Sequence, residues 1–168
     1  MRIAGCEAFW RLLHLLGGPG GRVSTIRSCR SADFGAVFEL LRQHWPEEMF
    51  REPALRGVFE RGLASPRQRY VCAEFDSRVV GFGSLTVKSS LRHEGAIGHV
   101  DELVVDYKYR CRGIATLLMQ RIEELAVAIG CRQLQLDCAF HRKEAHTFYR
   151  ERRFERRALL FAKALREI

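Results

Sequence analysis

One helical segment and the two extended segments that flank it constrain the fold more than any other feature of this sequence. Apolar residues recur at helical spacing between residues 113 and 129, and Gly130 then ends the pattern as a helix-terminating glycine. The apolar positions are Ile114, Leu117, Leu118, Ile122, Leu125, Ala126 and Ile129. Strand-like segments at 96–106 and 132–138 stand directly before and after this helix. The three segments together predict a right-handed crossover between two parallel strands.

The remaining segments predict a mixed α/β domain around that crossover. Further strands are expected at 24–29, 69–75, 78–87 and 158–165, and Asp76-Ser77 is typical of a hairpin turn. Further helices are expected after an N-cap at Ser31, after Pro53, and at 144–152. The predicted order is β-α-α-β-β-β-α-β-α-β.

The chain has 168 residues, which suits one domain. A glycine-rich break at 17–21 separates an expected N-terminal extension, residues 1–22, from a single domain at 23–168. The extension is either a short amphipathic helix or a flexible segment. Glu7, Arg11 and His14 interrupt its apolar run, so we expect neither a signal peptide nor a membrane span.

The net charge and the cysteine spacing limit the classes of function that the chain can have. Lys and Arg number 28 against 20 Asp and Glu, a formal net charge of +8. This excess favours an anionic partner, although a solvated arginine-rich surface gives the same total. The 6 cysteines form no C-x-x-C pair and have no zinc-site spacing. They indicate reduced thiols in a cytoplasmic protein, and no metal site is expected.

The entrance to the central helix, residues 109–118, combines positive charge with small residues. Arg110 and Arg112 precede it, and Gly113 and Ala115 lie in its first turn. Unpaired N–H groups and the helix dipole favour an anion at such a place. An ordinary basic turn has the same composition. Neither a Walker loop nor a G-x-G-x-x-G fingerprint is present.

Two sequence blocks resemble the Gcn5-related N-acetyltransferase (GNAT) superfamily. Residues 110–115, Arg-Cys-Arg-Gly-Ile-Ala, match its [QR]-x-x-G-x-[GA] signature, and Ala145 to Tyr149 match its later A-x-x-x-Y helix. The order of elements agrees over residues 23–165. The resemblance implies a twisted, mostly antiparallel sheet of about six to seven strands, with a central parallel pair and about four flanking helices.

The resemblance also implies an enzyme that transfers acetyl from acetyl-CoA directly to a primary amine, without a metal. The acceptor could be a polyamine, an aminoglycoside-like compound, an amino acid or a protein amine. Tyr149 would be the general acid that protonates the leaving thiolate. Backbone groups of Leu103, Val104 and Val105 would bind pantetheine. The pyrophosphate would be held by Arg110, Cys111, Arg112, Gly113, Ile114, Ala115 and Thr116. A non-catalytic acetyl-CoA sensor is the alternative.

An acidic pair on the strand before the helix supplies the candidate base. Glu102 is the first choice, Asp101 the second and His99 the third. Neighbouring strand residues face opposite sides, so both carboxylates reach one cleft only if a bulge intervenes. A solvated or ion-paired acidic pair is the alternative. A second acidic cluster, Glu47, Glu48 and Glu52, occupies the region that walls the acceptor site in the family.

Three residues depart from the family pattern. Cys111 and Arg153 stand where glycine is usual, and Arg142 stands where many members have asparagine. An arginine run at 150–157 could contact the CoA 3′-phosphate or an acidic partner, or remain solvated. Nucleic-acid binding is not expected because no aromatic interleaving accompanies the run. Dimers are common in the family, so a homodimer is compatible with the resemblance.

Overall fold

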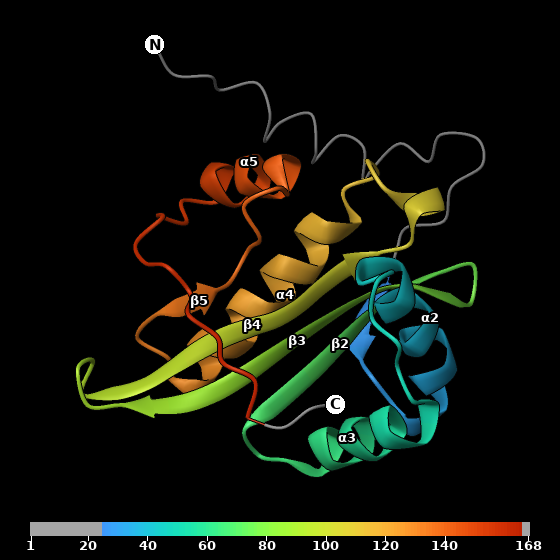
Figure 1. Ribbon diagram of the computed structural model, residues 1–168, viewed down its shortest axis with the longest axis horizontal. Coiled ribbons are helices and arrows are strands. Elements are labelled where there is room, and N and C mark those ends of the chain that lie inside the picture. The colour runs from blue at the N-terminus through green and yellow to red at the C-terminus, as the bar shows by residue number, and fades with distance from the viewer. Residues whose placement is uncertain (1–24, 166–168) are drawn as a thin grey trace.

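A single sheet with helices on both faces forms the domain. The computed structural model describes residues 25–165, so the expected extension at 1–22 lies outside the described residues. Figure 1 shows the elements along the chain. The strands are β1 (Thr25–Ser28), β2 (Gln68–Phe75), β3 (Arg78–Ser90), β4 (Gly95–Val105) and β5 (Leu134–Leu136). The helices are α2 (Phe34–His44), α3 (Glu52–Ala64), α4 (Ile114–Ile129) and α5 (Lys143–Glu151), with short 3-10 turns at Ser31–Asp33 and Tyr107–Tyr109.

The strands lie in the sheet in chain order, β1-β2-β3-β4-β5. The first four are antiparallel, and β4 pairs with β5 in parallel. The predicted crossover through α4 is therefore confirmed. The hairpin turn is confirmed too, because Asp76 and Ser77 both have positive φ, 47° and 60°, as a two-residue hairpin turn requires.

The expected final strand at 158–165 is wrong. That segment has no strand assignment, and Leu159, Leu160 and Phe161 are exposed. A strand needs a partner backbone, and no backbone hydrogen bond among residues 25–165 joins this segment to the 3-residue β5. The described sheet therefore has five strands, not six to seven, and its parallel pair lies at the edge, not the centre. The strand expected at 132–138 is likewise shorter, Leu134–Leu136.

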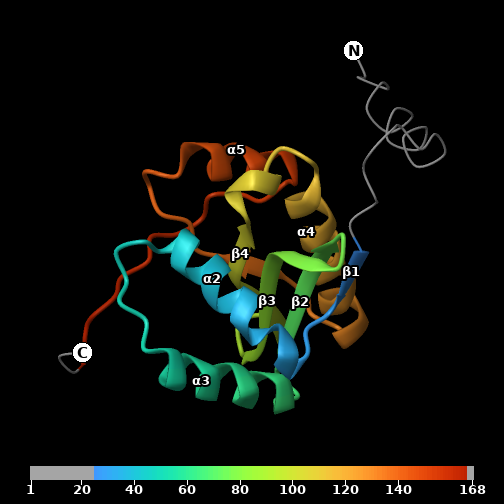
Figure 2. The ribbon, with the colours of Figure 1, turned by 90° about the vertical axis from the view of Figure 1, so that its right-hand side faces the viewer.

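Two apolar layers cover the sheet. Figure 2 shows α2 and α3 on one side and α4 on the other. A cluster around Phe34, Val37 and Phe82 fills the α2–α3 side, and a second around Leu118 and Ile122 fills the α4 side. Glycines in β3 allow close packing of α4, because a Cβ at residue 83 would lie 2.9 Å from the Ile122 side chain. No helix between residues 25 and 165 is long and apolar enough to span a membrane.

The two parallel strands separate after a short stretch. Their pairing runs from Gly98 and Leu134 to Val100 and Leu136, and β5 ends there. The strand β4 continues for five more residues, to Val105. The N-terminus of α4 and the helix α5 lie at this same end of the sheet (Figure 1). The edge of β4 at residues 101–105 therefore lacks a strand neighbour on the β5 side within the described part of the chain.

Candidate active site

A β-bulge in β4 brings both carboxylates of the acidic pair to one face of the sheet. Gly83 pairs with Leu103 and Leu85 with Val100, so Ser84 alone lies opposite Asp101 and Glu102. The Ser84 hydroxyl donates to Glu102, and the Thr86 hydroxyl donates to Asp101 at 2.6 Å. Ser84 and Thr86 are two residues apart on β3 and share a face, the one that α2 and α3 cover. The bulge that would place both acids in one cleft is therefore present.

Glu102 has the environment of a carboxylate that binds a proton more tightly than usual. Burial raises its pKa above the ordinary value, and Asp101 adds to the rise, while the Ser84 hydrogen bond opposes it. The Ser84 hydroxyl also accepts a hydrogen bond from the Glu102 backbone N–H at 3.0 Å, which fixes the bulge. Tyr70 faces the same acids, and burial with their charge raises its pKa to about 12. Glu102 can accept a proton at a pH nearer neutrality than a solvated glutamate can.

His99, the third candidate, contacts two carboxylates. Its Nδ1 lies 2.9 Å from Asp101 Oδ1 and its Nε2 lies 3.1 Å from Asp137 Oδ2. Asp137 follows β5, so the imidazole joins the two strands where they separate. Asp101 is therefore ion-paired, as one sequence-based alternative proposed, while Glu102 has no ion-pair partner among the contacts of the described residues. Ser84, Thr86 and Asp137 belong to no motif and carry no local signal in the sequence.

The loop before α4 turns its backbone into the left-handed region twice. Cys111 has φ 58° and Gly113, the N-cap of α4, has φ 76°. No side chain caps the helix, so N–H groups in its first turn are without intrahelical partners. Ile114 is buried under the sheet, whereas the side chains of Cys111 and Arg112 are exposed. This end of α4 suits an anion.

The loop arginines are partly engaged with the protein itself. Arg110 donates from Nε to the Val105 carbonyl at 3.3 Å. The Arg112 guanidinium lies 5.3 Å from the centre of the Tyr109 ring. In the first turn of α4, the Thr116 hydroxyl accepts a hydrogen bond from Arg152. Leu103, Val104 and Val105 lie beside this loop, on the part of β4 that pairs with β3 but not with β5.

Tyr149 lies at the same end of the sheet but on the α4 side. Its ring packs against the buried cluster beneath α4 and contacts the rings of Phe148 and Phe154 edge-on. Burial raises the pKa of its phenol to about 12, with Cys138 contributing, so it holds its proton at neutral pH. The protonated phenol of Tyr149 and the partly buried carboxylate of Glu102 therefore lie on opposite faces of the sheet.

Arg142 joins α2 to the loop before α5. It donates to His44 Nε2 at 2.6 Å and to the His44 carbonyl at 2.9 Å. Burial, with the nearby charges of Arg142 and Arg110, lowers the pKa of His44 to about 4, so the ring is neutral and accepts. Beyond α2, an open cavity of about 670 Å³ is lined by Glu48 of the predicted acidic wall, with Phe38, Glu39, Arg42, Gln43, Pro46, Met49 and Phe50. Glu52 instead pairs with Arg56 on α3.

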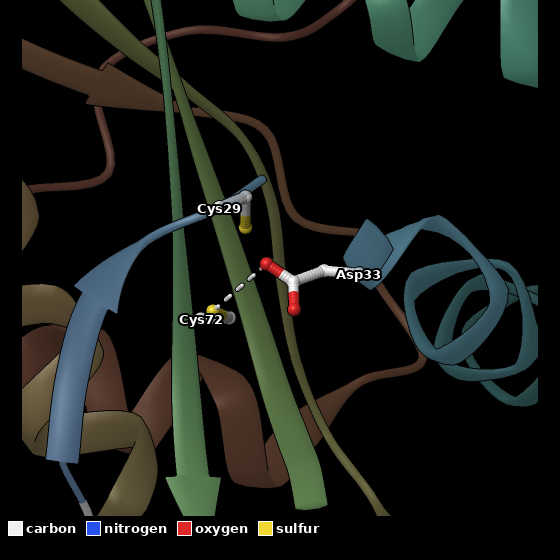
Figure 3. A group of neighbouring side chains, drawn as sticks. All are labelled: Cys29, Asp33 and Cys72. Carbon is white, nitrogen blue, oxygen red and sulfur yellow. Dashed lines mark hydrogen bonds between the residues drawn. The ribbon is translucent and has the colours of Figure 1, made fainter. Parts of the chain in front are cut away.

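One group of side chains in the described chain has ligand atoms close enough to hold a metal. Cys29, Asp33 and Cys72 are all buried, with ligand atoms within 4.8 Å of one another (Figure 3). The Asp33 carboxylate, however, already accepts two hydrogen bonds from Arg27, at 2.7 and 2.9 Å, and one from the Arg30 backbone. The guanidinium supplies the positive charge there, so the group is satisfied without an ion.

Comparison with known proteins settles the family. Residues 34–154, most of the chain, match the sequence profile of the acetyltransferase (GNAT) family. The chain belongs to the GNAT family. It is an N-acetyltransferase, as its two motifs predicted. Its parallel crossover and basic loop before α4 are thus GNAT features in this chain.

Named relatives and solved structures agree with this assignment. Glucosamine 6-phosphate N-acetyltransferase 1 of Oryza sativa subsp. japonica is 31% identical over 126 residues, covering 72% of this GNAT chain and 76% of the relative. The crystal structure of glucosamine-6-phosphate N-acetyltransferase from Arabidopsis thaliana has a TM-score of 0.74 at 21% identity, covering 86% and 100% of the two chains. An aminoglycoside N-acetyltransferase in complex with CoA has a TM-score of 0.78 at 18% identity, covering 89% and 99%.

Proposed function

We propose that this GNAT protein transfers the acetyl group of acetyl-CoA directly to a primary amine at the gap between β4 and β5. The observation that carries the proposal is the pair of proton-transfer groups at that gap. Glu102 is a partly buried carboxylate on the α2–α3 side, and Tyr149 is a partly buried phenol on the α4 side; burial raises the pKa of both. An amine acceptor needs a base to remove its proton, and a thiolate leaving group needs an acid.

The chain has the groups that acetyl-CoA requires. The unpaired edge of β4 at 103–105 offers backbone N–H and carbonyl groups to the pantetheine amides. The first turn of α4, with the left-handed loop at 111–113, offers N–H groups to the pyrophosphate. Arg110 and Arg112 add positive charge beside it. When bound, acetyl-CoA supplies a thioester whose carbonyl carbon the amine can attack.

Glu102 and Tyr149 then have complementary functions. Glu102, directly or through a water, takes a proton from the acceptor ammonium and frees the lone pair for attack. Tyr149 donates its proton to the sulfur as the C–S bond breaks, so CoA leaves as a thiol. The amine nitrogen loses a second proton as the amide forms, and this proton restores Tyr149 directly or through water. The proton on Glu102 is released to solvent, so each transfer releases one proton and both side chains return to their starting states. The raised pKa of Glu102 brings this base closer to the working pH, which favours proton transfer.

The acceptor face favours a cationic amine. Asp101, Glu102 and Asp137 lie along it, and His99 is the basic side chain that contacts two of them. Relatives at about 30% identity are named for glucosamine 6-phosphate, an amino sugar whose amine is protonated at neutral pH. We therefore place an amino sugar phosphate first among acceptors to test, ahead of polyamines, aminoglycosides and lysine peptides.

The test is an acetyl-transfer assay on those four acceptor classes. Acetylated product is measured by mass spectrometry, because the exposed Cys111 would itself react with a thiol reagent. We expect turnover on at least one amine, with saturation by acetyl-CoA. Tight binding of acetyl-CoA without transfer to any amine would favour the sensor function instead.

Two substitutions test the assigned groups. Tyr149→Phe removes only the hydroxyl, so kcat should fall about 10²-fold or more while the KM for acetyl-CoA stays nearly constant. Glu102→Gln should lower kcat to a similar extent and remove the acidic limb of the pH profile. The matched control is Tyr107→Phe, an exposed tyrosine outside the gap, which should keep full activity. Unchanged kcat in Tyr149→Phe would show that the phenol is not the acid.

A further inference from the structure

His99 lies between two carboxylates that come from different segments. It faces the α2–α3 side from β4, and Thr86 lies opposite it on β3. Asp101 Oδ1 contacts Nδ1 at 2.9 Å, and Asp137 Oδ2 contacts Nε2 at 3.1 Å. The side chain of His99 is 20% exposed, and those of Asp101 and Asp137 are 34% and 50% exposed. The imidazole is thus the more enclosed partner of both contacts.

The two contacts determine the charge of the ring. An ionised carboxylate can only accept a hydrogen bond, and a neutral imidazole carries a single N–H. Two hydrogen bonds to two carboxylates therefore require the doubly protonated imidazolium. The pKa of His99 is raised, first by the Asp101 hydrogen bond and also by the charge of Asp137, against burial and the charge of Lys88 on β3. Glu102 is the other ionisable group facing this cluster from β4.

The position of the bridge gives it a function. The last β4–β5 pair is Val100 with Leu136; Asp101 is the next residue of β4, and Asp137 is the first residue after β5. His99 therefore joins the strands at the first point where backbone pairing has ended. The second oxygen of Asp101 accepts from Thr86 at 2.6 Å, so the carboxylate is held on both sides beside Glu102.

We propose that His99, as an imidazolium, is a positioning residue of the acceptor site: it fixes the Asp101 carboxylate beside Glu102 and fastens Asp137 to β4 at the mouth of the strand gap. This rests on the proposed function only in naming that face as the acceptor side. Loss of the proton leaves the ring one N–H for two carboxylates. One of the two carboxylates then loses its hydrogen bond to His99, and the acidic groups at the entrance to the strand gap are no longer held in place. Acceptor binding should therefore weaken as His99 deprotonates.

The first experiment needs no acceptor. Imidazole ¹⁵N and ¹³C resonances of the full chain are followed by NMR from pH 5 to pH 9 in wild type, Asp137→Asn and Asp101→Asn. In wild type, both His99 nitrogens should stay protonated to a pH above the ordinary midpoint of about 6.5. Each substitution removes one carboxylate and should lower that midpoint. The imidazole resonances of His93, in the β3–β4 turn, are the internal reference and should be the same in all three proteins. A single-N–H ring at pH 6, or a His99 midpoint indifferent to both substitutions, would overturn the proposal.

The second experiment separates positioning from simple structural support. His99→Asn keeps one donor for Asp101 but no charge and no reach to Asp137. It should raise the KM for the acceptor identified above about tenfold, with kcat and the KM for acetyl-CoA changed less than about twofold. His93→Asn is the matched control and should behave as wild type, and thermal unfolding checks that both variants fold. A fall in kcat with unchanged acceptor KM contradicts the proposal. If no amine is acetylated, the proposed function fails while the NMR result still decides the His99 bridge.

Discussion

Cys111 and Arg153, which stand where the resemblance leads one to expect glycine, adopt the backbone conformation that glycine favours. Cys111 has φ 58° and Arg153 has φ 64°. A left-handed conformation costs a non-glycine residue about 1–2 kcal/mol. The chain keeps the turn before α4 and the turn after α5 despite that cost. Both turns therefore form in this chain without glycine, at the cost of a strained φ at each.

Substitution of Cys111 by glycine should stabilise the protein. Relief of the strained φ outweighs the added flexibility of the unfolded chain, so we expect the free energy of unfolding to rise by about 0.5–1 kcal/mol in urea titrations. Cys111→Ala removes the thiol and keeps the strain, so it should show no such gain. If both variants lost acetyl-CoA affinity equally in calorimetry, the thiol itself would contribute to binding, contrary to a tolerated replacement.

At the scale of elements, a few side chains hold the layers around the site together. Arg142 joins α2 to the loop before α5 through His44, and Arg27 joins β1 to Asp33, next to α2, and to Glu74 on β2. These contacts fix α2, the helix that covers the proposed acceptor face. The pair Arg142–His44 works only with a neutral imidazole, so its contribution depends on pH.

Acid should therefore weaken the protein through His44. The pKa of His44 in the folded state is about 4, below the ordinary value, so the unfolded chain takes up the proton first as the pH falls. The stabilisation is complete above about pH 6.5 and is lost progressively down to about pH 4. We expect the free energy of unfolding to fall by only about 1–2 kcal/mol across that window, because solvent partly screens the half-buried ring.

Urea titrations at several pH values measure this loss of stability. His44→Gln can still accept from Arg142 and should flatten this part of the curve; an unchanged slope in that variant would show that another group is responsible.

Local sequence patterns predicted most helices and strands, but contacts between residues far apart in the sequence could not be predicted from them. The spacing of apolar residues predicted α4, because one face of that helix is buried, and apolar runs bounded by turn residues predicted the two long strands, β3 and β4. The strand at 158–165 failed because apolar content alone does not supply a partner backbone. Arg142 with His44 and His99 with Asp137 are 98 and 38 positions apart, so no local pattern could pair them. The candidate site residues within the motifs could be proposed from the sequence, whereas their hydrogen-bond partners could not.

The whole molecule carries a formal net charge of +8 and is expected to bind an anionic cosubstrate. Some arginines near the end of the chain contact the body of the domain, and others form ion pairs on the surface. Arg152 bonds Thr116 and stacks on Phe148, while Arg157 pairs with Glu155. The remaining charge contributes a field that attracts polyphosphates over a distance set by salt.

Acetyl-CoA affinity should therefore depend on ionic strength. Raising salt from about 0.02 M to about 0.2 M shortens the screening length to below about 10 Å, so Kd should rise several-fold in calorimetry. Dephospho-CoA, which lacks the 3′-phosphate, should bind with a smaller salt dependence. Equal affinities across that range for acetyl-CoA would mean that backbone N–H groups, and not the net charge, dominate its binding.

The bulge in β4 also shifts the phase of the strand's apolar alternation. Val100 and Leu103 both pack on the α4 side although they are three residues apart, an interval that would place them on opposite faces of a regular strand. Apolar side chains before and after the bulge therefore still point into a core, and Val104 packs in the α2–α3 cluster. Side chains on one face of a regular strand are about 6.8 Å apart, whereas Asp101 and Glu102 are consecutive. One inserted residue therefore gives the proposed acceptor face two adjacent carboxylates, which a strand without a bulge does not provide on one face.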